Sequence, residues 1–492
     1  MNAVIAPATG KFETQVPILV IGAGAAGLCA ALAAKDAGVD AVVIERDPVT
    51  AGSTALSAGL IPAAGTRFQR AKRIDDNPQR FAGDIQRKAK GEADPAVVDA
   101  VVRGAAPLIE WLVDRYGLPF DVVDNFNYPG HSALRMHGLP SRTGRELIDR
   151  LRHAAEATGV TILTSRVAER LFVDPDGRIR GVEIVQRDGQ RERIGCEALI
   201  LACSGFGGNP ELVRRHIPEM ANALYFGHAG NRGDAIIWGD ALGAALSDLG
   251  SYQGHGSVAT PHNILISWAV IMQGGIQINR EGRRFCNETR GYSEQAAEVL
   301  RQPGEFVWNV FDERIAEVAR QFEDFREAER AGAILEAKDI ADLAHAMRVP
   351  VETFVAEWRE VENKKVAAAP DRFGRRFLAG QACKAPYRAV KVTGALFHTQ
   401  GGPAIDSDGR VKRKDGTIFP NLFAAGGAAA GISGSTAAGY LSGNGLLTAT
   451  VLGELAGKSS GGNVPPWAKS RHWPKQRTAS GPAITDSDAC WR

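Results

Sequence analysis

Residues 17–28 read Pro17-Ile18-Leu19-Val20-Ile21-Gly22-Ala23-Gly24-Ala25-Ala26-Gly27-Leu28. The apolar run at 18–21 predicts a buried parallel strand, and the alanine-rich run at 25–37 predicts a helix. Between them, the glycines have the spacing G-x-G-x-x-G. A second apolar run, 41–44, ends at Glu45, about 20 residues further on, where the dinucleotide fingerprint has its acidic residue. This strand–helix–strand unit predicts a nucleotide-binding fold.

Each glycine of this turn has a separate task. Gly22 allows the tight turn, Gly24 lets the backbone approach a pyrophosphate, and Gly27 lets helix and strand pack closely. The start of the helix offers N–H groups and a positive dipole end to phosphates. The carboxylate of Glu45 can accept two hydrogen bonds from a ribose diol. The predicted cofactor contacts in this unit are Gly22, Gly24, Ala25, Ala26, Gly27, Glu45 and Arg46.

Length and composition limit the function classes. The chain has 492 residues, which predicts more than one domain. A net charge of +2 gives no reason to expect a nucleic acid or an acidic membrane surface as partner. The six cysteines form no C-x-x-C pair, so we expect no metal site and a reduced, cytoplasmic setting. No apolar run reaches membrane-spanning length, and residues 1–15 lack a signal-peptide pattern and predict a loose arm.

Two further segments predict cofactor contacts. Residues 52–59 are small and rich in hydroxyl groups, which permits close backbone approach and bonds to phosphate or ring atoms. Residues 160–173 and 179–185 predict antiparallel strands joined at Asp174-Pro175-Asp176-Gly177. The candidate contacts here are Gly52, Ser53, Thr54, Ser57, Ala58, Gly59 and, on the first of these strands, Val167.

The pattern changes along the chain and predicts an α/β protein with an insertion. A Rossmann-like domain with a parallel sheet and helices begins at 14–254 and resumes at 386–457. Residues 255–385 have more aromatic side chains, a charged helical set at 312–338 and no further nucleotide turn, so we expect an inserted α+β capping domain that binds substrate. An apolar helix at 446–455 follows the last strand. Residues 458–492 are rich in Ser, Gly, Pro and charge and predict an extended tail.

Four motifs together resemble the superfamily of FAD-dependent fumarate reductases and 3-ketosteroid dehydrogenases, over roughly residues 14–457. They are the glycine turn, Leu199-Ile200-Leu201-Ala202-Cys203-Ser204-Gly205-Phe206, Arg284-Phe285-Cys286-Asn287-Glu288 and Asn421-Leu422-Phe423-Ala424-Ala425-Gly426. The resemblance implies FAD as cofactor, and the lack of a histidine near 52–59 predicts that it is bound non-covalently. It adds as contacts Ala202, Ser204, Gly205, Gly426, Asn444 and Leu446, the last two at a helix start beside the flavin ring.

One loop favours the branch of 3-ketosteroid dehydrogenases that act at C4–C5. Gly439-Tyr440-Leu441-Ser442-Gly443 is similar to that branch's G-Y-x-S-G element, and Tyr292 fits its second tyrosine from the capping domain. The resemblance assigns removal of the α-proton of a cyclic or activated ketone to Ser442 assisted by Tyr292. The resemblance assigns Tyr440 to the carbonyl oxygen or to the shared hydrogen-bond network, and it makes flavin N5 the acceptor of the hydride from the β carbon. The expected partners are a small ketone, which need not be a steroid, and an external electron acceptor that the sequence does not identify.

Two alternatives remain open at this point. His398-Thr399-Gln400-Gly401-Gly402 resembles the H-T-M-G-G element of fumarate reductases, so His398 is a further candidate catalytic residue and a (di)carboxylate is a possible substrate. However, the loop arginine of those enzymes is missing here, and Arg290 lies too close to Glu288 for their proton-transfer arginine. Arg135 and His137 resemble an R-x-H element of the family in an irregular segment, 119–144, where substrate contacts are expected. The other alternative is a flavoprotein electron-transfer subunit.

Overall fold

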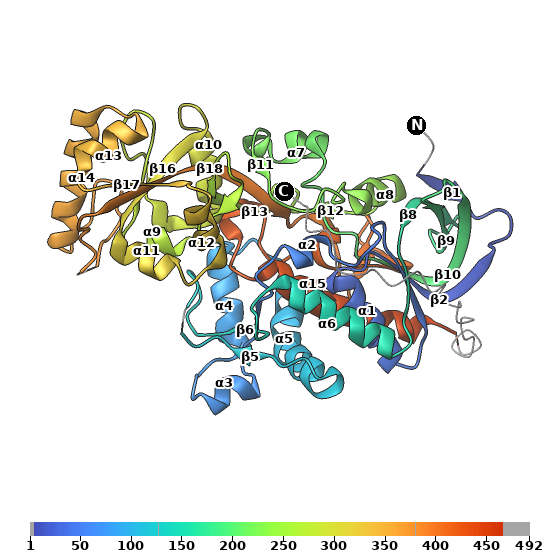
Figure 1. Ribbon diagram of the computed structural model, residues 1–492. Helices are drawn as coiled ribbons and strands as arrows, with labels where there is room; N and C mark the ends of the chain where they lie inside the picture. The colour runs from blue at the N-terminus through green and yellow to red at the C-terminus, as the bar shows by residue number, and fades with distance from the viewer. Residues whose placement is uncertain (1–3, 126, 379, 466–492) are drawn as a thin grey trace, which may run out of the picture.

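The computed structural model describes residues 4–125, 127–378 and 380–465 (Figure 1). Its larger sheet has nine strands in the order β1-β8-β9-β10-β2-β3-β7, with β21 beside β10 and β20 beside β21. The strands β21, β10, β2, β3 and β7 are parallel, whereas β8, β9 and β10 form an antiparallel meander. The bounds are β1 Ile5–Pro7, β2 Thr14–Ile21, β3 Ala41–Ile44, β7 Thr161–Leu163, β8 Arg166–Val173, β9 Ile179–Gln186, β10 Arg191–Leu201, β20 Arg410–Lys412 and β21 Ile418–Ala424.

The predicted nucleotide unit is present at the centre of this sheet. β2 is followed by α1 (Ala25–Asp36) and then by β3, which pairs with β2 in parallel. Gly22 has a φ of +107°, and a Cβ on Gly27 would lie 1.9 Å from the Gly22 carbonyl oxygen, so both positions require glycine. Helix α1 packs against α15 (Asn444–Asn463) and α6 (Gly144–Ala157), which leaves most of its residues buried.

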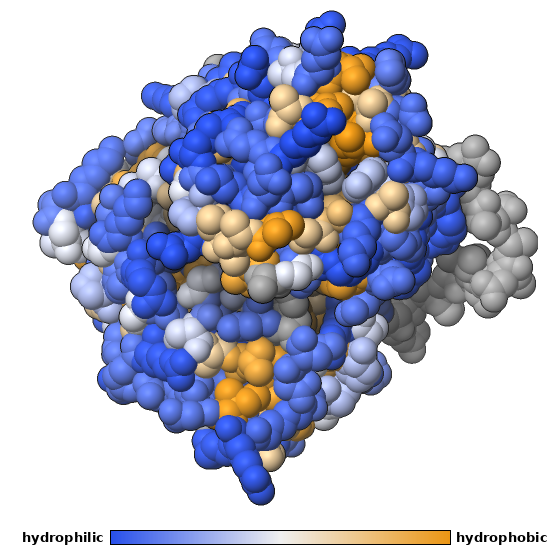
Figure 2. All heavy atoms as spheres, turned by 90° about the vertical axis from the view of Figure 1, so that its left-hand side faces the viewer, coloured by the Kyte–Doolittle hydropathy of each residue, from blue (hydrophilic) through white to orange (hydrophobic). Residues whose placement is uncertain are grey.

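A second sheet and its helices form the capping domain, at the left of Figure 1. Its seven strands run in the order β14-β13-β18-β16-β15, with β11 and β17 also paired to β18. Figure 2 views this end of the molecule, whose surface is mainly hydrophilic with apolar side chains in small patches. The bounds are β11 Leu224–Tyr225, β13 Tyr252–Ala259, β14 Ile264–Leu265, β15 Ile276–Ile278, β16 Phe306–Asp312, β17 Ile334–Ala337, β18 Tyr387–Thr399, α9 Ala269–Met272, α10 Tyr292–Leu300, α11 Glu313–Ala319, α12 Glu323–Arg330, α13 Ile340–Met347 and α14 Val351–Val366.

Shorter elements connect the two sheets. A three-stranded sheet, β4-β6-β5, lies with α3, α4 and α5 below the nucleotide unit in Figure 1. β12 (Leu246–Ser247) pairs with β19 (Gly402–Pro403). The remaining bounds are α2 Gly52–Ala55, β4 Ile61–Pro62, α3 Arg67–Ala71, α4 Pro78–Lys88, α5 Pro95–Tyr116, β5 Asp121–Val122, β6 Met136–Gly138, α7 Pro210–His216 and α8 Asp234–Leu242. No helix in the described part of the chain is both long and apolar enough to span a membrane.

The structure corrects the predicted boundaries at several places. The N-terminal segment is not a loose arm in its described part, because Ile5–Pro7 pairs with β8 and Thr14 already belongs to β2. The capping sheet takes in β11 and β18, so it extends beyond 255–385 on both sides. The predicted strand 160–173 is two strands, β7 and β8, because the chain turns at Ser165 with a φ of +54°.

The last helix is longer than predicted at both ends. It runs from Asn444 to Asn463 rather than over 446–455, so the first six residues assigned to the tail are helical. Its glycines are the reason: a Cβ on Gly453 or Gly457 would lie 2.3 or 2.2 Å from the carbonyl oxygens of Ala26 and Ala30 in α1. The glycines that weaken the helix signal in the sequence therefore allow α15 to pack directly on the backbone of α1. The rest of the predicted tail, 466–492, lies outside the described residues.

Candidate active site and cofactor cleft

A cavity of about 420 Å³ lies between the glycine turn and the capping domain. It begins at Gly22 and Glu45, passes the start of α15, and ends among aromatic side chains of the capping domain. The site therefore forms where the carboxyl ends of parallel strands meet a second domain, which is a common place for cofactors and substrates.

At the nucleotide end, two side chains hold the glycine turn in shape. Glu45 is nearly buried, and its two carboxylate oxygens accept hydrogen bonds from the backbone N–H groups of Ala23 (2.8 Å) and Asp47 (3.0 Å). Thr54 Oγ1 accepts from the Ala25 N–H at 3.0 Å, so the predicted 52–59 segment docks on the start of α1. Each carboxylate oxygen of Glu45 retains a second lone pair for a ribose hydroxyl.

The predicted cofactor residues separate into two groups. The cavity is lined by Gly22, Gly24, Ala25, Ala26, Glu45, Arg46, Gly52, Ser53, Thr54, Ser57, Ala58, Ala202, Ser204, Gly426 and Leu446. The positions that do not line it are Gly27, Gly59, Val167, Gly205 and Asn444. The three glycines permit close packing instead; a Cβ on Gly205, for example, would lie 2.0 Å from Thr399 Oγ1. The side chain of Val167 is 37% exposed, whereas its neighbours Arg166 and Ala168 line the cavity.

The segment before α8 also borders the nucleotide end, and the sequence analysis did not identify it. Asn231 Nδ2 donates to Ser53 Oγ and to the Tyr225 hydroxyl, both at 2.8 Å. Arg46 forms an ion pair with Asp234 at 2.5 Å. The signal available in the sequence was a glycine-containing loop just before a helix, which resembles many ordinary loops.

At the other end, the structure brings the four predicted catalytic residues together. The Tyr292 hydroxyl lies 3.0 Å from Ser442 Oγ, and the rings of Tyr292 and Tyr440 meet edge to face with centroids 6.3 Å apart. Burial raises the pKa of both tyrosines above their ordinary value, which keeps them protonated at neutral pH. For Tyr292, the hydrogen bond with Ser442 lowers the pKa and so opposes that shift.

His398, the fourth predicted catalytic residue, lies beside Tyr440 with ring centroids 5.5 Å apart. Its Nδ1 is 2.8 Å from the side-chain nitrogen of Gln400, which can only donate, so Nδ1 accepts and Nε2 carries the proton. Burial lowers the pKa of His398 to about 4. His398 is therefore a neutral group at pH 7.

His255 and Trp268 line the capping-domain end of the cavity, and the sequence analysis did not identify them. His255 stacks on Tyr292 and Phe397, with centroids 5.1 and 5.6 Å away, and Trp268 lies edge-on to it. Both line the cavity and are buried, and neither His255 Nδ1 nor Trp268 Nε1 has a hydrogen-bond partner. Burial lowers the pKa of His255 to about 3, so it too is neutral. In the sequence, His255 is a single histidine within a strand, and no motif around it indicates that it lines the cavity.

The arginines of the carboxylate alternative lie elsewhere. Arg290 is exposed and does not line the cavity. Arg135 is buried in ion pairs with Asp76 and Asp84, and His137 contacts Thr66, so neither faces the cavity. Among the described residues, the lysines and arginines that line the cavity are Arg46 and Arg166, both at the nucleotide end.

Comparison with known proteins identifies the family of this chain. The family model described as FAD binding domain matches residues 17–446. The chain belongs to the FAD-binding domain family. The glycine turn fits the cofactor, because Gly22 and Gly24 bring the backbone at the start of α1 to the wall of the cavity, while Gly27 permits the close packing of the turn itself. This member of the FAD-binding domain family is an FAD-dependent oxidoreductase with the predicted α/β fold, and its relatives and structural neighbours carry names from the superfamily that the motifs resemble.

The curated relatives are named as reductases, and the solved structures of similar fold include a reductase and a dehydrogenase. The chain is 29% identical over 454 residues to the probable fumarate reductase Ifc3 of Shewanella frigidimarina, covering 92% of this chain and 76% of that one. It is 27% identical over 468 residues to the urocanate reductase of Eggerthella lenta, covering 91% and 75%. An open flavocytochrome c3 fumarate reductase has a TM-score of 0.79 at 27% identity, covering 92% and 79%. The fold also matches a 3-ketosteroid Δ4-(5α)-dehydrogenase from Rhodococcus jostii, with a TM-score of 0.74 at 23% identity, covering 92% and 98%.

Proposed function

We propose that this flavoprotein dehydrogenates a neutral ketone, cyclic or otherwise activated, at the bond between its α and β carbons. The observation that carries the proposal is the 3.0 Å contact between the hydroxyls of Tyr292 and Ser442 beside Tyr440. When bound, FAD supplies the acceptor for the hydride from the β carbon. Every other task falls to side chains of the chain itself.

The hydroxyl groups of Tyr440, Tyr292 and Ser442 have different roles in the proposed proton transfer. Tyr440 keeps its proton at neutral pH, so it is suited to donate a hydrogen bond to the ketone oxygen, which acidifies the α carbon. The Tyr292–Ser442 pair is the candidate acceptor of the α-proton: one hydroxyl first releases its own proton to solvent, and the hydrogen bond from the other stabilises the oxyanion that is left. That oxyanion then takes the α-proton, which restores both hydroxyls. The aromatic side chains around the pair exclude water from the reacting carbons.

The charges of the cavity support a neutral substrate. A dicarboxylate held among Tyr292, His255 and His398 would lie beside two neutral imidazoles. Among the described residues, no lysine or arginine side chain lines this end of the cavity. A carboxylate buried without a cation or several donors pays a large desolvation cost. A ring-shaped ketone, steroid-like in its flat apolar body, instead gains from contact with the aromatic walls.

The names of the relatives support a second candidate, the reduction of an unsaturated carboxylate. The Shewanella protein is named a probable fumarate reductase and the Eggerthella protein a urocanate reductase, and both align over most of this chain. In this chain such a reaction would depend on neutral donors around His398 rather than on arginine. An electron-transfer role within a complex remains the third candidate; it predicts that no small ketone reduces the flavin.

The experiment that separates these candidates is anaerobic mixing of the holoenzyme with two sets of compounds. Saturated steroid 3-ketones and substituted cyclohexanones are expected to bleach the flavin, whereas succinate is not. Dithionite-reduced enzyme is then offered fumarate, urocanate and acrylate. Reoxidation by one of these acids, together with no bleaching by any ketone, would replace our proposal with the second candidate.

Two further properties belong to the same proposal. We propose that FAD is bound without a covalent link, because residues 52–59 contain no histidine. Acid precipitation is then expected to leave the yellow colour in the supernatant rather than in the pellet. The five described cysteines are unpaired, which supports a reducing, cytoplasmic setting for the enzyme.

A further inference from the structure

His131 contacts the loop that carries Ser442, although 311 residues separate the two in sequence. Its Nε2 lies 2.9 Å from the Ser442 carbonyl oxygen. Because a carbonyl only accepts, Nε2 carries the proton and donates it. Burial and the charge of Arg135 lower the pKa of His131 to about 4, so the neutral ring makes this bond throughout the neutral pH range.

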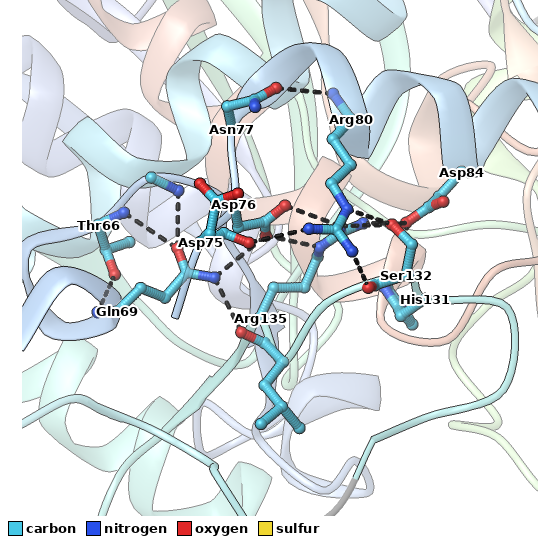
Figure 3. Close-up of polar contacts among 12 residues, drawn as sticks. Thr66, Gln69, Asp75, Asp76, Asn77, Arg80, Asp84, His131, Ser132 and Arg135 are labelled. Atoms are coloured by element: carbon cyan, nitrogen blue, oxygen red, sulfur yellow. Dashed lines mark hydrogen bonds and ion pairs between the residues drawn. The ribbon is translucent and has the colours of Figure 1, made fainter. Parts of the chain in front are cut away.

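A buried cluster of polar side chains around Arg135 holds the segment that carries His131 in place (Figure 3). The next residue, Ser132, donates its backbone N–H and its hydroxyl to Asp84 at 2.8 and 2.7 Å. Arg135 donates to the same Asp84 oxygen at 2.7 Å and makes two bonds of 2.9 Å to Asp76. The ring of Phe81 packs on the His131 ring, with centroids 6.0 Å apart. Both the backbone and the ring of His131 are therefore held in place.

The loop that receives this contact, residues 431–443, is anchored to other segments mainly in its first half, where Gly431 and Ser433 bond Gln400 and Ser435 bonds Glu92. Glycine occurs in it at 431, 434, 439 and 443, and Ser442 is a single residue away from the left-handed turn at Gly443, whose φ is +88°. Close packing adds to the hydrogen bond, because a Cβ on Gly130 would lie 2.7 Å from Leu441 Cδ1. Segment 130–131 thus supports residues 441–442 directly.

We infer that His131 is a positioning residue for the reaction: it holds the Ser442 backbone so that the Ser442 hydroxyl stays within hydrogen-bond reach of Tyr292. This inference rests on the proposed function for its kinetic consequence, but its structural consequence does not need a substrate. The residue acts through Ser442 and does not itself line the cavity. A misplacement of about 1 Å in a reacting group costs up to 10²-fold in rate.

The test compares three variants of the holoenzyme. His131→Leu removes the donor, and His131→Gln keeps an N–H at a similar distance along the side chain. The matched control is His137→Leu, because His137 is equally buried on the same segment, has a pKa lowered to about 4, and bonds Thr66 rather than the active-site loop. Each variant is measured by crystal structure and by anaerobic flavin reduction with the best ketone.

In His131→Leu we expect the Tyr292–Ser442 contact to lengthen beyond 3.5 Å, the flavin reduction rate to fall at least tenfold, and KM and flavin content to stay unchanged. His131→Gln and His137→Leu are expected to keep both the contact and the rate, even where they lower the melting temperature. A His131→Leu enzyme with the 3.0 Å contact intact would overturn the inference. If that variant does not fold, a His131→Gln enzyme that loses the contact or the rate as severely as Ser442→Ala would overturn it too.

The outcomes also separate this inference from the proposed function. If no ketone reduces the wild-type flavin, the proposed function fails, while the distance in the His131→Leu structure still decides whether His131 positions Ser442. If the contact is lost but a ketone reduces the variant at the wild-type rate, the positioning has no catalytic consequence and the inference is wrong as stated.

Discussion

The Tyr292 hydroxyl lies 3.0 Å from the Ser442 hydroxyl, and the two residues come from different domains. Tyr292 is the first residue of α10 in the capping domain, whereas Ser442 lies in the loop that leads into α15 of the nucleotide domain. The hydrogen bond between the two hydroxyls therefore forms only when the capping domain packs against the nucleotide domain. Under the proposed function, this arrangement links the enclosure of a substrate to the assembly of the Tyr292–Ser442 pair.

Replacing Glu45 by alanine is expected to weaken FAD binding at least tenfold. The variant loses the carboxylate that we propose as acceptor for the ribose hydroxyls, in charge-assisted bonds worth on the order of 1.5–3 kcal/mol each, and it frees the Ala23 N–H that shapes the turn. Titration of the apoenzyme with FAD, followed by flavin fluorescence, measures the change. Once saturated with FAD, the variant should turn over at close to the wild-type rate; an unchanged Kd would show that Glu45 is not the ribose ligand.

The contact between α1 and α15 gives a stability prediction with an internal control. Gly457→Ala places a Cβ 2.2 Å from the Ala30 carbonyl oxygen, so it must push the helices apart and lower the melting temperature by several degrees. Gly462→Ala in the same helix meets nothing within 4 Å and should stabilise the protein by about 0.5–1 kcal/mol. Thermal melts of the two variants with equal effects would contradict this packing.

Trp268→Phe keeps an aromatic ring in the cavity and removes an N–H donor that has no partner in the protein. If that donor bonds an oxygen of the substrate, the variant should bind an oxygen-bearing ketone about two- to tenfold more weakly, since such a bond is worth about 0.5–1.5 kcal/mol. Trp308→Phe is the control, because the Trp308 Nε1 is also unpartnered but its ring does not line the cavity. Equal ketone affinities of wild type and Trp268→Phe, measured by flavin difference spectra, would rule out this contact.

Acid should destabilise the protein through its buried neutral histidines. Burial lowers the pKa of His255 to about 3 from its ordinary 6.5, so at pH 5 the unfolded chain binds a proton there and the folded chain does not. Stability from this group is complete above pH 6.5 and is lost as the pH falls toward 3, by about 2 kcal/mol between pH 7 and pH 5. Urea unfolding at both pH values should show a smaller loss for His255→Phe than for wild type. An equal loss would mean that His255 is charged in the folded protein.

The nucleotide domain was predictable because its signals are local. The strand at 18–21, the glycine turn and Glu45 lie within 30 residues, and the structure places them as expected. The bounds of helices and strands were predicted less accurately where a contact with a distant part of the chain decides the structure. Ile5–Pro7 reads as a loose arm and becomes a strand only because β8 offers a free edge. The Ser- and Gly-rich end of α15 reads as a tail and is helical because α1 accepts it.

The same distinction applies to the candidate site. Tyr440 and Ser442 stand out in a glycine loop, and Tyr292 follows a recognisable segment, so family resemblance was enough to propose them. His255, Trp268 and Asn231 carry no motif, and they reach the cavity because β13, α9 and the loop before α8 happen to converge there. Sequence spacing cannot report that convergence, since it is produced by the pairing of β13 with β18 across more than a hundred residues.

The most direct test of the central claim is the rate of anaerobic flavin reduction by a ketone in Ser442→Ala and Tyr440→Phe, compared with wild type in one stopped-flow series. Loss of a proton-transfer group typically costs 10²–10⁴-fold in rate. We predict that both variants keep their flavin and melting temperature and reduce at least 100-fold more slowly. Reduction of both variants at the wild-type rate would contradict the assignment of this site to ketone dehydrogenation.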